Sequence, residues 1–348
     1  MKKAKPILIM AAVAALLSAA VYFFVFNLLA LADQSKLPQS FRVKNTADAK
    51  VKNELSFSFA GDVMLGRNVG HYFQKNNFKD LFANFDAGAF QGKDIFWFNL
   101  EGPISNLEIK QNPKDKSLVF NFSRQAIEAL KYLKITTAGL ANNHTANQGA
   151  AGLEKTKNIL KQAGIDANGD PNKIDGSGVT HYSQGDLVVS LIAVNALYDA
   201  KGAEQIIKQE KSQHNFVIVL PHWGNEYQTT HSAGQEKLAR SWIGAGADLI
   251  IGGHPHVVQD AQVINGKLVF YSLGNFIFDQ MFSAETQQGL ILSGIISAGK
   301  LKITLTPIIS KNMKPEIMRG ADRLKIIDRI CGSLGDYCID DKIEISLK

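Results

Sequence analysis

Five short polar clusters contain the residue types in this sequence that bind divalent cations. Each cluster directly follows an apolar, β-branched or aromatic run. The clusters are Gly61-Asp62, Asn99-Leu100-Glu101-Gly102, Asn142-Asn143-His144, Pro221-His222-Trp223-Gly224 and Gly252-Gly253-His254-Pro255-His256. Carboxylates, amide oxygens and imidazoles are ligands for hard and borderline divalent cations. The sequence therefore predicts a metal site, and we expect it to be dinuclear.

Two of the clusters place a carboxylate at the end of an apolar run. Asp62 follows Gly61, which gives the backbone room for an irregular turn, and its carboxylate either binds metal or caps the turn. Glu101 follows an aromatic run, where a buried unpaired charge is costly, so it binds a cation or pairs with a base. Because a carboxylate has two oxygens and can bridge two cations, Glu101 is the natural shared ligand.

The other three clusters supply amide and imidazole groups. Asn143 offers a neutral carbonyl ligand, and the adjacent His144 can protonate a leaving oxygen without itself holding metal. The loop that contains His254 and His256 can turn each ring toward a different cation. A lone histidine is usually structural or solvated. Together with His222, however, three histidines follow apolar runs beside two acids, which favours metal binding.

Strand and helix patterns alternate along the chain between these clusters. The runs that predict strands are 55–59, 95–98, 216–220, 249–251 and 268–271. The stretches that predict helices are 124–134, 152–163 and 235–245. This alternation predicts an α/β sheet, in which binding sites form beyond the carboxyl ends of the strands. Every cluster lies at such an end, so we expect the clusters to form one site.

An apolar segment near the N-terminus predicts export of the rest of the chain. Residues 7–32 carry no charge and follow a basic start. A bilayer span needs about 20 apolar residues and a signal-peptide core about 7 to 15, so the length favours an uncleaved anchor. Against that, Ala30-Leu31-Ala32 has the pattern of a cleavage site. We expect a single-pass protein of the cytoplasmic membrane with an extracytoplasmic C-terminal domain, or a periplasmic or secreted protein after cleavage near Ala32.

Four segments follow from these patterns. They are a leader at 1–32, a polar linker at 33–52, a main domain at 53–310 and a C-terminal extension at 311–348. The extension contains Cys331 and Cys338, which flank a turn-rich segment. In an oxidising compartment these two would pair as a disulfide, and the alternative is two independent thiols.

The composition is that of an ordinary globular protein. The chain has 348 residues, of which 45% are hydrophobic and 20% charged. Its formal charge is +6, but three of the positive charges are Lys2, Lys3 and Lys5, in front of the apolar segment. No stripe of Lys and Arg with interleaved aromatic residues is evident, so nucleic-acid binding is not expected.

The order of the clusters resembles that of the calcineurin-like metallophosphoesterase superfamily, which reads Asp-x-His, Gly-Asp-x-x-Asp, Gly-Asn-His-Asp/Glu, His and Gly-His-x-His. The residues within the motifs are more similar to those of its CapA branch. This branch is associated with bacterial poly-γ-glutamate capsule production and often carries an N-terminal membrane anchor. The motifs that carry the resemblance are Gly-Asp-Val-Met-Leu-Gly-Arg from Gly61, Asn-Leu-Glu-Gly-Pro, Asn-Asn-His, Pro-His-Trp-Gly, Gly-Gly-His-Pro-His and Tyr-Ser-Leu-Gly-Asn-Phe from Tyr271. They lie within residues 55–280.

The resemblance implies a four-layer α/β/β/α sandwich with two divalent cations, of Mn, Fe or Zn. The implied ligands are Asp62 and His256 for one cation, Asn143, His222 and His254 for the other, and Glu101 as the bridge. Two cations lower the pKa of bound water and neutralise phosphate oxygens, which permits hydrolysis of a phosphoester. His144 would be the general acid, Arg67 a clamp for phosphate, and Asn275 a residue that orients substrate or a ligand.

Two residues depart from the superfamily pattern. Met64 stands where the first histidine ligand belongs, and Glu101 replaces the usual bridging Asp. The first site therefore has fewer protein ligands than the pattern provides. It binds its cation weakly, uses an extra residue such as His231, or is empty at rest. Metal binding is thus better supported than hydrolysis.

Three functions are compatible with these features. The first is a metal-dependent phosphoesterase that acts on a cell-surface polymer precursor or a lipid-linked phosphate. The second is a non-enzymatic component that binds and guides an anionic polymer during capsule synthesis or export. The third is an amidase or γ-glutamyl hydrolase, because metal-activated water also attacks carbonyls. The expected partners are the cytoplasmic membrane, the anionic polymer or phosphoester, and other capsule-synthesis membrane proteins.

Overall fold

The computed structural model describes residues 53–105, 118–198 and 200–347, which belong to one compact unit. The predicted leader at 1–32 and linker at 33–52 lie outside the described residues. Within the described ranges, no helix has both the length and the apolar character that a bilayer crossing requires.

The larger of two sheets has ten strands and carries the first half of the predicted site. Its strands are β1 (Glu54–Val63), β2 (Ile95–Leu100), β3 (Thr137–Gly139), β4 (Asp166–Asn168), β11 (Asn275–Ile277), β12 (Gln288–Ser297), β13 (Lys300–Lys311), β14 (Lys314–Ile317), β15 (Cys338–Ile339) and β16 (Lys342–Ser346). Their order is β15-β16-β13-β12-β1-β2-β3-β4, with β11 beside β1 and β14 beside β13. Strands β1 to β4 are parallel, so their carboxyl ends meet at one edge.

The smaller sheet has six strands and carries the second half. They are β5 (Thr180–Gln184), β6 (Leu187–Asn195), β7 (Phe216–His222), β8 (Leu249–Ile251), β9 (Ala261–Ile264) and β10 (Lys267–Phe270). The order is β5-β6-β7-β8-β10-β9, with four parallel strands between two antiparallel edge strands. The five predicted strands fall in β1, β2, β7, β8 and β10, and the predicted α/β architecture is confirmed.

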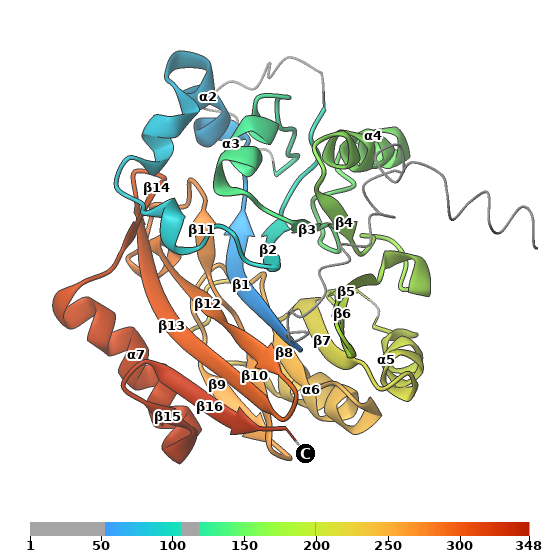
Figure 1. The fold of residues 1–348 in the computed structure, drawn as a ribbon. Helices are drawn as coiled ribbons and strands as arrows, with labels where there is room; N and C mark the ends of the chain where they lie inside the picture. Colours follow the sequence, from blue (N-terminus) through green and yellow to red (C-terminus); the bar gives the residue numbers. More distant parts are fainter. Residues whose placement is uncertain (1–52, 106–117, 199, 348) are drawn as a thin grey trace, which may run out of the picture. The chain divides into compact units, whose positions relative to one another are not determined.

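Helices cover the outer faces of both sheets (Figure 1), while the last α-helix of the chain packs on the core between the sheets. The helices are α2 (Arg67–Lys75), α3 (Ala126–Leu133), α4 (Gly149–Gln162), α5 (Ala203–Ser212), α6 (Ala233–Ala245) and α7 (Gly320–Leu334). One apolar core joins α2, α3 and α4 to the ten-stranded sheet, and another joins α5 and α6 to the six-stranded sheet. A third lies between the sheets, and the alternating β1 residues Leu55, Phe57 and Phe59 belong to it. The layers therefore run helix, sheet, sheet, helix.

The predicted C-terminal extension is an integral part of the larger sheet. Strand β16 pairs with β13, and Ile326, Ile327 and Ile330 of α7 join the core between the sheets. A disulfide joins Cys331 of α7 to Cys338 of β15, so the predicted pairing is present. The segment after residue 311 thus adds strands and core residues to the domain that contains the site.

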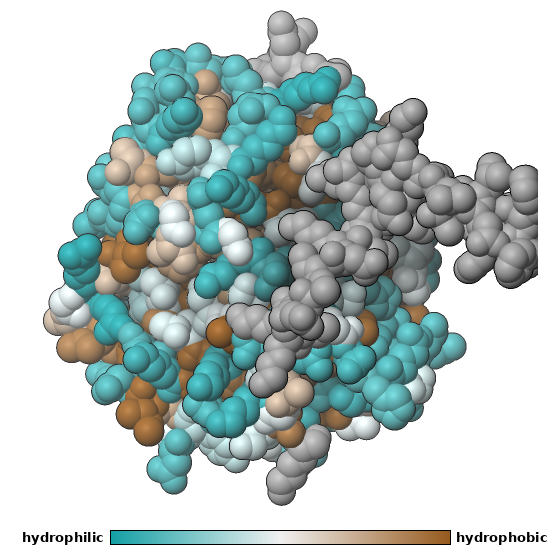
Figure 2. Space-filling model, in the orientation of Figure 1, coloured by the Kyte–Doolittle hydropathy of each residue, from teal (hydrophilic) through white to brown (hydrophobic). Residues whose placement is uncertain are grey.

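The surface of the domain is mainly hydrophilic on the face drawn in Figure 2. Apolar residues occur there in small groups among polar ones. Isolated apolar residues are normal on the surface of a globular domain and call for no special explanation.

Candidate metal centre

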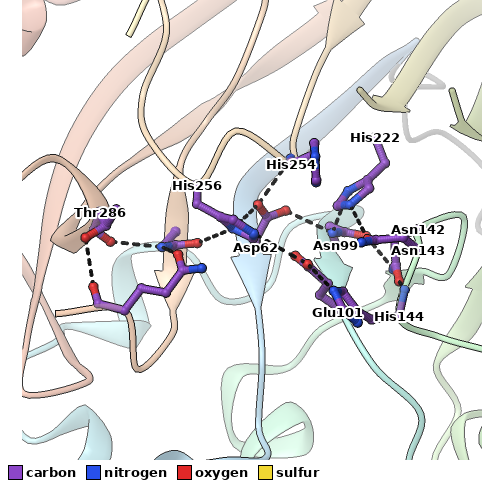
Figure 3. A network of polar contacts seen from close by, with 12 residues as sticks. Asp62, Asn99, Glu101, Asn142, Asn143, His144, His222, His254, His256 and Thr286 are labelled. Carbon is purple, nitrogen blue, oxygen red and sulfur yellow. Dashed lines mark hydrogen bonds and ion pairs between the residues drawn. The ribbon is translucent and has the colours of Figure 1, made fainter. Parts of the chain in front are cut away.

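The structure brings the predicted metal ligands together at the carboxyl edge of both sheets (Figure 3). From the ten-stranded sheet come Asp62 near the end of β1, Glu101 directly after β2, and Asn143 after β3. From the six-stranded sheet come His222, the last residue of β7, and the loop after β8 with His254 and His256. The expectation that clusters distant in sequence form one site is therefore met in the geometry of the fold.

Asp62 is fully buried and accepts three hydrogen-bonding contacts. Its Oδ1 accepts from Asn99 Nδ2 at 2.9 Å, and its Oδ2 accepts from the backbone N–H of His254 at 3.2 Å. His256 Nδ1 lies 3.2 Å from the same Oδ2. Burial alone would raise the pKa of Asp62, but the hydrogen bond and charge of His256 outweigh it and lower the pKa to about 2. Asp62 is thus an anion at neutral pH, as a metal ligand must be.

Glu101 is the clearest sign that the site suits a cation. Both of its carboxylate oxygens are buried and have no hydrogen-bond partner. Its Oε1 lies 3.6 Å from His256 Nε2 and 3.8 Å from His144 Nε2. Burial raises the pKa of Glu101 to about 8. Because an unpartnered buried carboxylate is costly and two oxygens can serve two cations, these residues suit a divalent metal site with Glu101 at its centre.

The loop after β8 adopts a strained backbone that aims its two histidines. His254 and His256 have φ angles of 95° and 58°, values that side-chain-bearing residues seldom adopt. Gly253 before them has no side chain, and a Cβ there would lie 2.9 Å from Asp62 Oδ1. Backbone strain of this kind costs about 1 to 3 kcal/mol per residue and concentrates at functional sites. The loop conformation therefore supports a functional role for both histidines.

His256 has one ring nitrogen directed at acceptors and the other at Glu101. Its Nδ1 lies 3.1 Å from Asn275 Oδ1 and 3.2 Å from Asp62 Oδ2. Both are acceptors, so Nδ1 carries a hydrogen and Nε2 is the ring atom that would bind a cation. A histidine that binds metal usually donates its other N–H in this way. Burial lowers the pKa of His256, but the charge of Glu101 and the hydrogen bond to Asp62 outweigh it and raise the pKa to about 9, so Nε2 must lose a proton to bind metal.

The second group of predicted ligands is also assembled. His222 Nε2 lies 2.9 Å from Asn143 Oδ1, and the rings of His222 and His254 are 4.7 Å apart. The Nδ1 atom of His254 is buried without a partner. Burial lowers the pKa of His222 well below its usual value and lowers that of His254 to about 4. Both rings are therefore neutral at neutral pH, the form that binds metal.

Two sets of possible ligand atoms stand out among the described residues. Asp62, Glu101 and His256 have ligand atoms within 4.8 Å of one another, which matches the predicted first site plus the bridge. Glu226, His254 and His256 form the second set at the same spacing. Glu226 was not among the predicted ligands. The only hint in the sequence was its place four residues after His222, in the same turn-rich segment.

His144 points toward the candidate metal centre from the opposite side of Glu101 to His256 (Figure 3). Its Nδ1 lies 3.0 Å from Asn147 Oδ1, which also accepts the backbone N–H of Phe120. Because Asn147 Oδ1 is an acceptor, His144 Nδ1 carries a hydrogen and Nε2 is the atom that faces Glu101. The ring stacks on Phe120 with centroids 4.1 Å apart, and burial lowers the pKa of His144. Asn147 therefore fixes the orientation that an acid at Nε2 requires.

Three asparagines hold the candidate ligands in place, two of them without a predicted role. Asn99 donates to Asp62 and has its Nδ2 3.2 Å from His222 Nδ1. Asn142 in turn donates to Asn99 Oδ1 at 2.9 Å. Asn275 is fully buried, and its amide donates to the backbone oxygen of Thr286 while its Oδ1 faces His256. These contacts suit the predicted role of Asn275 in orienting a ligand, whereas its predicted contact with substrate stays a prediction.

Arg67 and His231 are held elsewhere. Arg67 forms two hydrogen bonds to Asp279, at 2.6 and 3.1 Å, so its guanidinium is already paired, and its role as a phosphate clamp stays a prediction. His231 Nδ1 lies 2.8 Å from Asp260, and its ring stacks on Tyr271. His231 is absent from both ligand sets of the described residues, so the suggestion that it replaces the missing ligand is not supported.

A polar cavity adjoins the second ligand group. Its volume is about 340 Å³, and its walls include Asn143, Asp170, Lys173, Asn195 and Tyr198. Lys173 is paired with Asp175 at 2.9 Å. The cavity could receive the part of a polar substrate that extends beyond the reacting group.

Cation binding at this site is expected to strengthen as the pH rises. Metal ligation needs an ionised Glu101 and neutral imidazoles, yet burial raises the pKa of Glu101 and the nearby carboxylates raise that of His256, so this pair keeps at least one proton in the metal-free protein. Binding must therefore release at least one proton, and the apparent Mn²⁺ affinity should rise about tenfold per pH unit between about pH 5 and 8. The metal-free fold should lose stability as the pH rises over this interval, because Glu101 loses its proton at a lower pH in the unfolded chain than in the folded one.

Titration calorimetry in two buffers of different ionisation enthalpy would count the released protons. An Mn²⁺ affinity that does not change between pH 5 and 8 would contradict a site in which Glu101 and His256 release a proton when the cation binds.

The packed sheets and the ligand cluster at their carboxyl edge define an α/β protein with a candidate metal centre between two sheets. The sequence matches the family described as bacterial capsule synthesis protein PGA_cap, over residues 56–195 and 174–280. The chain therefore belongs to this family, and the predicted CapA resemblance is confirmed.

The chain is also similar to individual relatives and to a solved structure. The chain is 29% identical to the PGA biosynthesis protein CapA of Bacillus subtilis (strain 168), over 73% of this chain and 71% of the relative. It is 27% identical to the capsule biosynthesis protein CapA of Bacillus anthracis, over 84% of this chain and 78% of the relative. A purple acid phosphatase from yellow lupin is similar with 9% identity and a TM-score of 0.36, over 85% of this chain and 54% of that chain.

Proposed function

We propose that this protein is a metal-dependent phosphoester hydrolase that acts during capsule or cell-surface polymer synthesis. The observation that carries the proposal is the pair of unpartnered, buried oxygens of Glu101. One of them, Oε1, lies 3.6 Å from His256 Nε2 and 3.8 Å from His144 Nε2, so a group for cation binding and a group for proton transfer share one carboxylate. The two relatives named for capsule or PGA synthesis support the biological setting.

The residues of this chain divide the chemistry between them. Asp62, Glu101 and His256 would hold one divalent cation, and His222, His254 and Asn143 the other. When bound, Mn, Fe or Zn would supply positive charge for phosphate oxygens and lower the pKa of a water. His144 would donate a proton from Nε2 to the leaving oxygen, and Asn147 keeps the ring in the required orientation. Negative charge on a bound phosphate would raise the pKa of His144 and favour its acid form.

The site of action in the cell is part of the same proposal. The uncharged residues 7–32 support a leader that exports the domain, either anchored in the cytoplasmic membrane or released after Ala32. Expected substrates are phosphoesters of an exported polymer precursor or of a lipid carrier. Other capsule-synthesis membrane proteins are the expected partners.

A direct assay tests the activity. The full chain, purified in detergent and freed of metal with a chelator, should hydrolyse an aryl phosphodiester or monoester only after Mn²⁺ is added back. Mg²⁺ added at equal concentration is a useful comparison, because histidine-rich sites favour transition metals and zinc over Mg²⁺. Turnover that is equal with and without added metal would rule out the proposed chemistry.

A non-enzymatic role is the second candidate, and the cavity beside Asn143 favours it. Its polar walls could hold an anionic polymer without any reaction. Polymer binding that persists after metal removal, together with no turnover, would support this role over hydrolysis.

A further inference from the structure

The loop after β7 places an acidic side chain at the metal centre that the ligand pattern does not include. One carboxylate oxygen of Glu226 lies within 4.8 Å of ring nitrogens of His254 and His256. The two histidines are buried, whereas Glu226 is exposed. The carboxylate therefore reaches the centre from its solvent side, where a cation would still lack protein ligands.

The chain around Glu226 is tied directly to the loop that carries the histidines. The backbone N–H of Tyr227 donates to the oxygen of Pro255, between His254 and His256, at 2.8 Å. The Tyr227 ring also lies 6.2 Å from the His256 ring. The residue after Glu226 is thus fixed against the two histidines, which sets the position of the carboxylate relative to them.

The same segment is fixed at both ends by side chains from elsewhere. Gly224 has a φ of 85°, and a Cβ there would lie 2.6 Å from Gln235 at the start of α6. Gln259 donates to the backbone oxygens of Gln228 at 2.8 Å and Thr230 at 3.0 Å. Gln235 in turn donates to Gln259 at 2.9 Å. The position of Glu226 is therefore preorganised by a network that connects α6 to the site.

The centre has room for this ligand because Met64 does not supply one. Met64 is fully buried in the core beneath the helices, and its sulfur accepts the backbone N–H of Gly66 at 3.1 Å. The thioether thus fills apolar space at the position where the superfamily pattern has a histidine. A site with one ligand fewer binds its cation more weakly unless another donor compensates.

We propose that Glu226 is a carboxylate ligand of the metal centre beside His254 and His256, where it compensates for the ligand that Met64 does not provide to the cation of Asp62 and His256. This inference rests on the proposed metal-dependent function. With Asp62 and Glu101, it brings three carboxylates to two divalent cations, which leaves a net positive charge that attracts an anionic substrate. Because the carboxylate is exposed, substrate entering from solvent would meet the cation beside it.

Metal binding by the full chain tests the assignment without relying on turnover. Titration calorimetry with Mn²⁺ would compare the wild type with Glu226→Gln, which removes the charge, and Glu226→Asp, which keeps the charge but shortens its reach. Glu285→Gln removes an exposed charge of the same kind and is the matched control. Loss of an oriented supporting residue already weakens metal affinity about 10- to 100-fold, so loss of a ligand should weaken one of two Mn²⁺ sites at least about 100-fold.

Each outcome decides the question. Weakened binding in both Glu226 variants, with Glu285→Gln unchanged, supports ligation. Unchanged binding in Glu226→Gln overturns it, and wild-type affinity in Glu226→Asp overturns it in favour of a distant charge effect. A wild-type protein that binds no Mn²⁺ overturns the metal-dependent function itself, together with this inference. Equal thermal unfolding of the metal-free proteins would confirm that the exposed substitutions leave the fold intact.

Discussion

Replacing Glu101 by glutamine is expected to abolish stabilisation by metal and hydrolysis together. The side chain keeps its size, but an amide cannot bridge two cations as a carboxylate does. A ligand present at 100 times its Kd stabilises a folded protein by about 2.7 kcal/mol. The wild type should therefore unfold at a clearly higher temperature with Mn²⁺ than without it. The Glu101→Gln variant should unfold at nearly the same temperature in both conditions.

The metal-free proteins provide the internal check on Glu101. Its carboxylate is buried and unpartnered, and burial raises its pKa to about 8, so the uncharged amide should be tolerated in the fold. Glu128→Gln is the matched control, because Glu128 is an exposed glutamate of α3. It should keep the full response to Mn²⁺. A Glu101→Gln variant that binds as much Mn²⁺ as the wild type would show that Glu101 is no bridge.

The positions of the ligands could be predicted from the sequence because they depend on local patterns. The alternation in 55–59 and the aromatic run in 95–98 form β1 and β2, and the acids that follow them lie at the carboxyl edge. Parallel strands bring such ends together whatever the length of chain between them. The same reasoning located the turn at His222. Hence the sequence indicated at which edge of the sheets the site lies and which residue types form it.

The contacts between distant side chains could not be predicted in this way. Arg67 is paired with Asp279, which is 212 positions away in the sequence, so nothing local to Arg67 indicates that its charge is already used. Asn275 is fully buried because β11 lies beside β1. Glu226 is exposed and follows no apolar run, so only the folded loop brings it to His254. These three depend on tertiary packing rather than on the order of strand ends.

Replacing His144 by alanine is expected to slow hydrolysis about 100- to 10,000-fold, the usual contribution of a positioned general acid. Its Nε2 faces Glu101 at 3.8 Å, and its Nδ1 is held by Asn147. His144 itself belongs to neither ligand set of the described residues, so Mn²⁺ binding should be unchanged in the variant. Steady-state rates and calorimetric Mn²⁺ binding, measured on the same preparation, separate the two properties.

The leaving group distinguishes proton donation by His144 from a merely structural role. The p-nitrophenolate released from a p-nitrophenyl ester is a stable anion and needs little help from an acid. The alkoxide released from an alkyl ester needs a proton as the P–O bond breaks. His144→Ala should therefore lose far more rate on the alkyl ester than on the p-nitrophenyl ester. An equal loss on both would point to a role in positioning the substrate or the cations. Asn147→Leu removes the acceptor at Nδ1 and should show the same preference for good leaving groups, with a smaller loss, because it acts through the orientation of His144.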